Sequence, residues 1–168
     1  MMSGKPIFLI GMMGSGKSSF ALALANALKV PVYDTDLEIE KLTSYSVSEL
    51  FSEFGEAYFR EQEKALIEKL PEQAAVVACG GGLPCHGELM DTLLQRGHVI
   101  YLSAPAKVLY ERIGGSEDRP LLQDLNSFDL LLEKRKEVYQ QANYIIDAQQ
   151  VPSVLLNDCL TFLNKDLS

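Results

Sequence analysis

Strand-length apolar segments alternate along the chain with longer stretches whose apolar residues recur at helical spacing. The strand-length segments lie at 6–10, 32–34, 74–79, 99–102 and 144–147. The helical pattern predicts helices over 17–28, 46–55, 57–70, 86–95, 105–113, 127–142 and 153–164. Because strands that alternate with helices are typical of a parallel sheet covered on both faces, we predict a three-layer α/β/α fold.

Local signals define two of the helix starts. Ser46 is followed three residues later by Glu49, which is the pattern of a capping box, and Ser127 is predicted to cap the helix that follows it. The chain contains no internal repeat, low-complexity run or linker. Its length suits one domain spanning 1–168.

Residues 11–18 fit the phosphate-binding pattern G-x-x-x-x-G-K-[ST] between a predicted strand and a predicted helix. Gly11, Gly14 and Gly16 can adopt positive φ and let main-chain N–H groups approach phosphate oxygens. Lys17 would bridge the β- and γ-phosphates, and the Ser18 hydroxyl would ligate Mg²⁺. The alternative is an ordinary glycine turn before a helix. The strand–loop–helix context favours nucleoside triphosphate binding.

Polar and glycine residues follow two more predicted strands, where ligands of parallel α/β sheets bind. Asp34 and Asp36 follow one strand: one could hold Mg²⁺ through water while the other accepts a proton, or one could cap a helix. A run of three glycines, 80–82, follows another strand. This run is either a sharp turn or a place where the backbone approaches a ligand.

Three arginines are candidates for anion binding, and each has a structural alternative. Arg60 could pair with Glu63 three residues later on a helix, and Arg135 could belong to a solvated basic helix face. Arg119 precedes Pro120 in a glycine-rich polar loop, where a residue that closes over phosphates would be well placed.

Composition narrows the partners and the compartment. The net charge of −8 argues against non-specific binding to nucleic acid or acidic membranes, so an anionic ligand must be held by local basic groups. Three cysteines, an odd number without metal-binding spacing, favour a reducing compartment. No signal-peptide pattern or membrane-length apolar run is present. We expect a cytoplasmic protein and a monomer.

Taken together, the motifs resemble the shikimate kinases. They comprise the loop at 11–18, Asp34-x-Asp36, Phe59-Arg60-x-x-Glu63, the glycines at 80–82, Arg119-Pro120-Leu121-Leu122, and Arg135 followed by Tyr139. This resemblance implies a P-loop kinase fold with strand order 2-3-1-4-5. It also implies transfer of the ATP γ-phosphoryl group to the 3-hydroxyl of shikimate, a step in aromatic amino acid biosynthesis.

The resemblance further implies a role for individual residues. Asp36, Arg60, Gly81 and Arg135 would bind shikimate, with the two arginines on its carboxylate and Asp36 as the base. A substrate-binding segment is expected at about 37–60 and a lid loop at about 112–124. The expected catalytic residues are Lys17, Asp36 and Arg119. The expected metal site is Mg²⁺ on Ser18, with Asp34 acting through water. The expected ATP-binding residues are Gly14, Ser15, Gly16, Lys17, Ser18, Ser19, Arg112 and Arg119.

Two other functions remain open at this point. One is a different small-molecule kinase on the same fold, such as a gluconate or nucleotide kinase. The other is a catalytically silent nucleotide-binding or partner-binding module. Retention of Lys17, Ser18, Asp36 and Arg119 counts against the silent module, because such a module has no physical need for all four.

Overall fold

The computed structural model describes residues 4–114 and 124–165, and within them five parallel strands form one sheet. Their order is β2-β3-β1-β4-β5, as the resemblance implied. The strands are β1 (Ile7–Ile10), β2 (Val32–Asp34), β3 (Val76–Ala78), β4 (His98–Ser103) and β5 (Tyr144–Asp147). The pattern-based prediction of a parallel α/β sheet is therefore confirmed.

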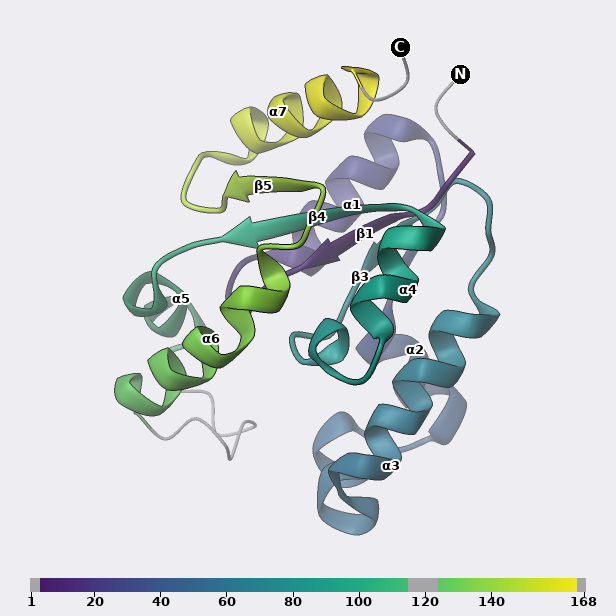
Figure 1. Cartoon of the computed structure of the whole chain (residues 1–168), viewed down its shortest axis with the longest axis vertical. Coiled ribbons are helices and arrows are strands. Elements are labelled where there is room, and N and C mark those ends of the chain that lie inside the picture. Colours follow the sequence, from purple (N-terminus) through teal and green to yellow (C-terminus); the bar gives the residue numbers. More distant parts are fainter. Residues whose placement is uncertain (1–3, 115–123, 166–168) are drawn as a thin grey trace.

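Helices lie on both sides of the sheet (Figure 1). They are α1 (Lys17–Leu28), α2 (Thr35–Thr43), α3 (Val47–Lys69), α4 (Leu89–Arg96), α5 (Ala106–Ile113), α6 (Leu125–Tyr139) and α7 (Pro152–Lys165), with a short 3-10 helix η1 (Leu83–Cys85). Helix α1 packs on α7, α5 on α6, and α2 on α3, which extends beyond the sheet (Figure 1). Within the described ranges, no helix is both long enough and apolar enough to cross a membrane.

The central strand β1 explains why the sheet forms where it does. All four of its side chains are buried, as expected for a parallel strand covered on both faces. Leu9 is paired with Ala78 of β3 on one side and with Ile100 of β4 on the other, and Ala78 is paired with Asp34 of β2. This register brings the loops that follow β1, β2 and β3 to the same edge of the sheet.

Three local predictions differ from the structure or are refined by it. The hydrophobic pattern did not predict α2, which begins directly after β2 and was implied only by the helix-cap alternative for Asp34 or Asp36. The predicted helices on either side of Gly55 join as α3, whose regular backbone is interrupted there at φ 84° and ψ 168°. The cap predicted at Ser127 was wrong: Asp124 caps α6 by accepting a hydrogen bond from Ser127 N. The capping box of Ser46 and Glu49 is present.

Arg96 at the end of α4 forms hydrogen bonds to the end of α3. Its guanidinium donates to Ile67 O and to Leu70 O, the latter at 2.6 Å, so a cation lies at the C-terminus of α3. We predict that Arg96→Leu lowers the free energy of unfolding by about 1–3 kcal/mol, because two partly buried carbonyls lose their donors. Urea denaturation measures this loss. Lys69→Ala, an exposed change in the last turn of α3, is the control, and an equal loss there would contradict the prediction.

Candidate active site

The loop at 11–18 has the backbone that its glycines were predicted to provide. Gly11, Gly14 and Gly16 have φ of 144°, 82° and 85°, and Gly16 is the N-cap of α1 without a side-chain cap. A Cβ on Gly14 would lie 2.6 Å from Leu109 O, so the main chain passes close to α5 here. The loop therefore leads into a helix N-terminus whose first N–H groups and dipole favour an anion.

Lys17 and Ser18 begin α1 and have different hydrogen-bond partners. Lys17 Nζ donates to Gly11 O at 2.6 Å and to Met12 O at 2.9 Å, so its ammonium lies against the loop backbone. Ser18 Oγ donates to Asp34 Oδ2 at 2.6 Å. Ser15 is buried within the loop, whereas Ser19 is exposed on α1.

Asp34 serves two structural purposes at once. Its Oδ1 accepts hydrogen bonds from the N–H groups of Asp36 and Leu37, which makes it the N-cap of α2, while its Oδ2 faces Ser18. The helix-cap alternative for one of the two aspartates is therefore correct for Asp34. A hydroxyl and a carboxylate side by side suit a hard cation that also binds phosphate and water. Across 4–114 and 124–165, no group of three or more His, Cys, Asp or Glu could hold a metal by itself.

The three glycines after β3 each lie against a different charged side chain. None of them has positive φ. A Cβ on Gly80 would lie 2.7 Å from Asp36 Oδ1 and 3.1 Å from Glu63 Oε1. A Cβ on Gly81 would lie 3.2 Å from Arg135 Nη1, and one on Gly82 would lie 2.5 Å from Arg60 Nη2. A side chain at Gly80 or Gly82 would displace the end of Asp36 or Arg60, so the run allows the predicted substrate-binding residues to lie together beside the glycine loop.

Two hydrogen bonds hold the glycine run in place. Gly80 N donates to Oγ1 of the fully buried Thr35 at 2.8 Å, which joins the start of α2 to the end of β3. Tyr139 OH on α6 donates to Gly81 O at 2.5 Å. Because both partners are buried, the run is fixed to elements on either side of it.

Arg60 on α3 makes the ion pair with Glu63 that the structural alternative foresaw. Its Nη1 is 2.7 Å from Glu63 Oε2, and its Nη2 is 3.1 Å from Glu56 Oε1. The guanidinium carbon lies 5.8 Å and 5.4 Å from the ring centres of Phe51 and Phe59. The guanidinium is also packed beside Gly82, so most of its surface is in contact with the protein.

Glu63 is the carboxylate most strongly perturbed by its surroundings. Its side chain is fully buried, and Oε1 has no hydrogen-bond partner within the described part of the chain. Burial raises the pKa of Glu63 to about 7, with a further rise from the nearby Asp36 carboxylate, although Arg60 acts in the opposite direction. Glu63 therefore exchanges its proton near neutral pH, directly beside Arg60.

Arg135 and Arg112, two further predicted arginines, have different hydrogen-bond partners. Arg135 on α6 donates from Nη1 to Met12 Sδ at 3.5 Å, which places it between the glycine loop and Gly81. Arg112 on α5 donates to Ala148 O at 2.9 Å and to Gly14 O at 3.4 Å, so it joins the glycine loop to the residue after β5. Arg119 and most of the predicted lid loop lie outside the described residues.

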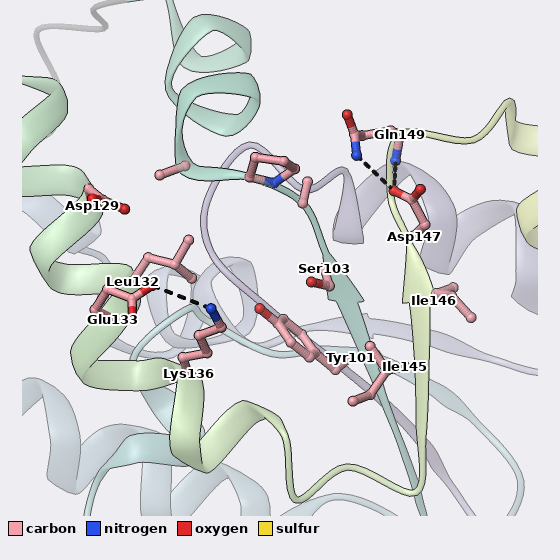
Figure 2. Close-up of a pocket in the computed structure, with 13 residues that line it drawn as sticks. Tyr101, Ser103, Asp129, Leu132, Glu133, Lys136, Ile145, Ile146, Asp147 and Gln149 are labelled. Atoms are coloured by element: carbon pink, nitrogen blue, oxygen red, sulfur yellow. Dashed lines mark hydrogen bonds and ion pairs between the residues drawn. The ribbon is translucent and has the colours of Figure 1, made fainter.

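A cavity of about 670 Å³ lies elsewhere, between α6 and strands β4 and β5 (Figure 2). Tyr101, Leu132 and Ile145 contribute apolar surface to it, and Lys136 forms an ion pair with Glu133 at 3.4 Å on its α6 side (Figure 2). None of the residues predicted for phosphate or substrate binding lines this cavity. The candidate active site is therefore the edge of the sheet where the glycine loop and residues 80–82 lie side by side.

The sequence analysis missed three residues at this site. Thr35 binds Gly80 N, Glu56 binds Arg60, and His86 Nε2 lies 3.7 Å from Glu56 Oε1. Burial and the nearby Arg60 lower the pKa of His86. Of these three residues, only Glu56 could have been found from the sequence. It precedes Arg60 by four residues on a predicted helix, a spacing that favours an ion pair.

The sheet order, the glycine loop before α1 and the converging charged residues define a P-loop kinase. A family model for shikimate kinase matches residues 13–164. The shikimate kinase of Persephonella marina is 40% identical over 157 residues, covering 92% of this chain and 96% of that protein. The shikimate kinase of Aquifex aeolicus is 34% identical over 159 residues, covering 94% and 95%. The chain belongs to the shikimate kinase family.

Solved structures agree with this assignment. A shikimate kinase from Acinetobacter baumannii in complex with shikimate has a TM-score of 0.91 at 31% identity, covering 98% of this chain and 96% of that one. A gluconokinase from Sinorhizobium meliloti has a TM-score of 0.67 at 19% identity, covering 98% and 94%. The second likeness shows the fold alone.

The raised pKa of Glu63 predicts a pH dependence of stability. The folded pKa of about 7 lies above the ordinary value of 4.5, so the folded state binds this proton more tightly than the unfolded chain. The resulting stabilisation is complete below about pH 4.5 and is lost as pH rises through about 7. We predict that Glu63→Gln removes this loss.

Urea denaturation of the wild type and the variant between pH 4.5 and 8 tests this prediction. The difference in free energy of unfolding between the two proteins should change in favour of Glu63→Gln as pH rises. Glu61→Gln, an exposed change on the same helix, should instead follow the wild type. A constant difference between wild type and Glu63→Gln would show that Glu63 titrates at its ordinary pKa.

Proposed function

We propose that this protein transfers the γ-phosphoryl group of ATP to the 3-hydroxyl of shikimate. The observation that carries the proposal is the convergence of Asp36, Arg60 and Arg135 on residues 80–82, beside the glycine loop, in a member of the shikimate kinase family. Two guanidinium groups suit the carboxylate of shikimate, because their planar forks bind it directionally. Asp36 supplies a carboxylate for the substrate hydroxyls.

The proposed chemistry is a loose phosphoryl transfer in which the protein positions the reactants and offsets charge. Asp36 would accept the proton of the attacking hydroxyl, since its Oδ1 lies beside Gly80 at the end of β3. Lys17 would leave the carbonyls of Gly11 and Met12 to bind the β- and γ-phosphates. Gly81 would contribute a backbone contact to the substrate.

The proposed metal is Mg²⁺, held by Ser18 directly and by Asp34 through water. The 2.6 Å hydrogen bond between these two side chains supports this assignment, because both present oxygen atoms next to the glycine loop. When bound, Mg²⁺ would offset negative charge on the phosphates. Gly14, Ser15, Gly16 and Ser19 would contact ATP, Arg112 would lie against the adenine, and Arg119 would close over the phosphates.

An acceptor assay tests the proposed function. We expect shikimate to raise Mg²⁺- and ATP-dependent release of ADP well above the background ATPase rate, whereas quinate, gluconate and nucleoside monophosphates do not. Stimulation by one of those other acceptors would keep the phosphate-loop roles but reassign Arg60 and Arg135. Tight ATP binding without stimulation by any acceptor would indicate a catalytically silent protein.

Asp36→Asn tests the proposed base. We predict a fall in kcat on the order of 100-fold or more with little change in the KM for ATP, because the amide cannot accept the proton. Steady-state kinetics at saturating shikimate measure both parameters. Glu38→Gln removes an acid that pairs with Lys41 on the same helix, and it should retain wild-type kcat. Near-normal turnover of Asp36→Asn would remove Asp36 from the catalytic role.

A further inference from the structure

The guanidinium of Arg60 is enclosed on most of its sides. Its Nη1 pairs with the fully buried Glu63, and a Cβ on Gly82 would lie within 2.8 Å of both Nη1 and Nη2. The rings of Phe51 and Phe59 lie within cation–π distance of it. Only 14% of the Arg60 side chain is exposed. Little of this guanidinium is therefore open to a ligand.

The remaining Nε–Nη2 edge is held by Glu56. Glu56 Oε1 lies 3.1 Å from Nη2 and 3.4 Å from Nε, so one carboxylate oxygen bridges both nitrogens. This edge is one along which a guanidinium binds a carboxylate through two parallel hydrogen bonds. In the structure, that place is taken by a side chain of the same helix.

The two glutamates on Arg60 differ in how easily they can be displaced. Glu63 is fully buried, whereas the Glu56 side chain is 54% exposed and follows the irregular backbone at Gly55. Because the Glu56 carboxylate is half exposed to solvent, its ion pair with Arg60 contributes less than that of the buried Glu63, so a ligand can replace Glu56 more readily than Glu63. A hollow of about 450 Å³ beside Arg60, lined by both basic and acidic side chains, offers room for the displaced carboxylate.

We propose that Glu56 is an internal competitor for the substrate carboxylate. It occupies the Nε–Nη2 edge of Arg60 in the free protein, is displaced when an acidic substrate binds, and thereby sets the affinity for that substrate. This inference rests on the proposed function, in which Arg60 binds the carboxylate of shikimate. It makes Glu56 a determinant of substrate affinity that acts through Arg60.

The competitor hypothesis predicts that removing a side chain beside the binding site increases the affinity for shikimate rather than reducing it. Glu56→Gln should bind shikimate about two- to five-fold more tightly than the wild type, the factor expected from removing an exposed charged competitor. Glu56→Ala, which also removes the hydrogen-bond acceptor, should tighten binding at least as much. In both variants the KM for shikimate should fall by a similar factor, while kcat and ATP affinity stay at wild-type values.

Calorimetric titration with shikimate and with ATP, together with steady-state kinetics, measures these effects. Glu61→Gln is the matched control, because Glu61 is an exposed acid on the same helix and adjoins Arg60 in sequence. This control measures how far the loss of one negative charge increases the affinity for any anionic ligand. Tightening in the Glu56 variants beyond that control supports the proposal.

Three results would overturn the proposal. These are unchanged shikimate affinity in both Glu56 variants, weaker affinity in either, and tightening no greater than in Glu61→Gln. Weaker affinity would mean that Glu56 remains on Arg60 and orients it in the complex. Failure of the wild type to bind or phosphorylate shikimate would instead refute the proposed function, so the two failures are distinguishable.

Discussion

The positions of Asp36 and Arg60 in the candidate active site depend on the absence of side chains at Gly80 and Gly82. Ordinary atoms cannot approach within 3 Å of a Cβ, yet Asp36 and Arg60 come closer than that to the positions where Gly80 and Gly82 would carry one. Arg135 is within 3.2 Å of the corresponding position at Gly81. The chain adopts no left-handed conformation at any of the three. Space, rather than backbone freedom, is what these glycines provide.

This space is useful only because the sheet aligns what surrounds it. The parallel register places the ends of β1, β2 and β3 side by side, so the phosphate loop, the start of α2 and the glycine run share one edge. Thr35 and Tyr139 then fix the run through hydrogen bonds to Gly80 and Gly81. A ligand site assembled from rigid elements in this way loses little entropy on binding.

The sequence was sufficient to predict the features that depend on residues close to one another in the chain. Alternation of strand and helix patterns predicted the layers, and the glycine spacing predicted positive φ at Gly11, Gly14 and Gly16. Helix α2 escaped prediction because few of its residues are buried, and the start of α6 was misplaced because Asp124 and Ser127 are both good caps. The Thr35–Gly80 bond joins residues 45 positions apart, and no local pattern encodes such a contact.

Charge beside the substrate-binding arginines is set by a few neighbouring carboxyls rather than by the net charge of −8. Arg60 and Arg135 lie there with Asp36, Glu56 and Glu63, and among these five side chains only that of Glu63 is buried. With all five ionised, the carboxylates would outnumber the guanidiniums and oppose an anionic substrate. Burial raises the pKa of Glu63 to about 7, so a proton on Glu63 removes one of these negative charges near neutral pH. Burial of one carboxyl therefore lowers the negative charge around the two arginines of an acidic protein.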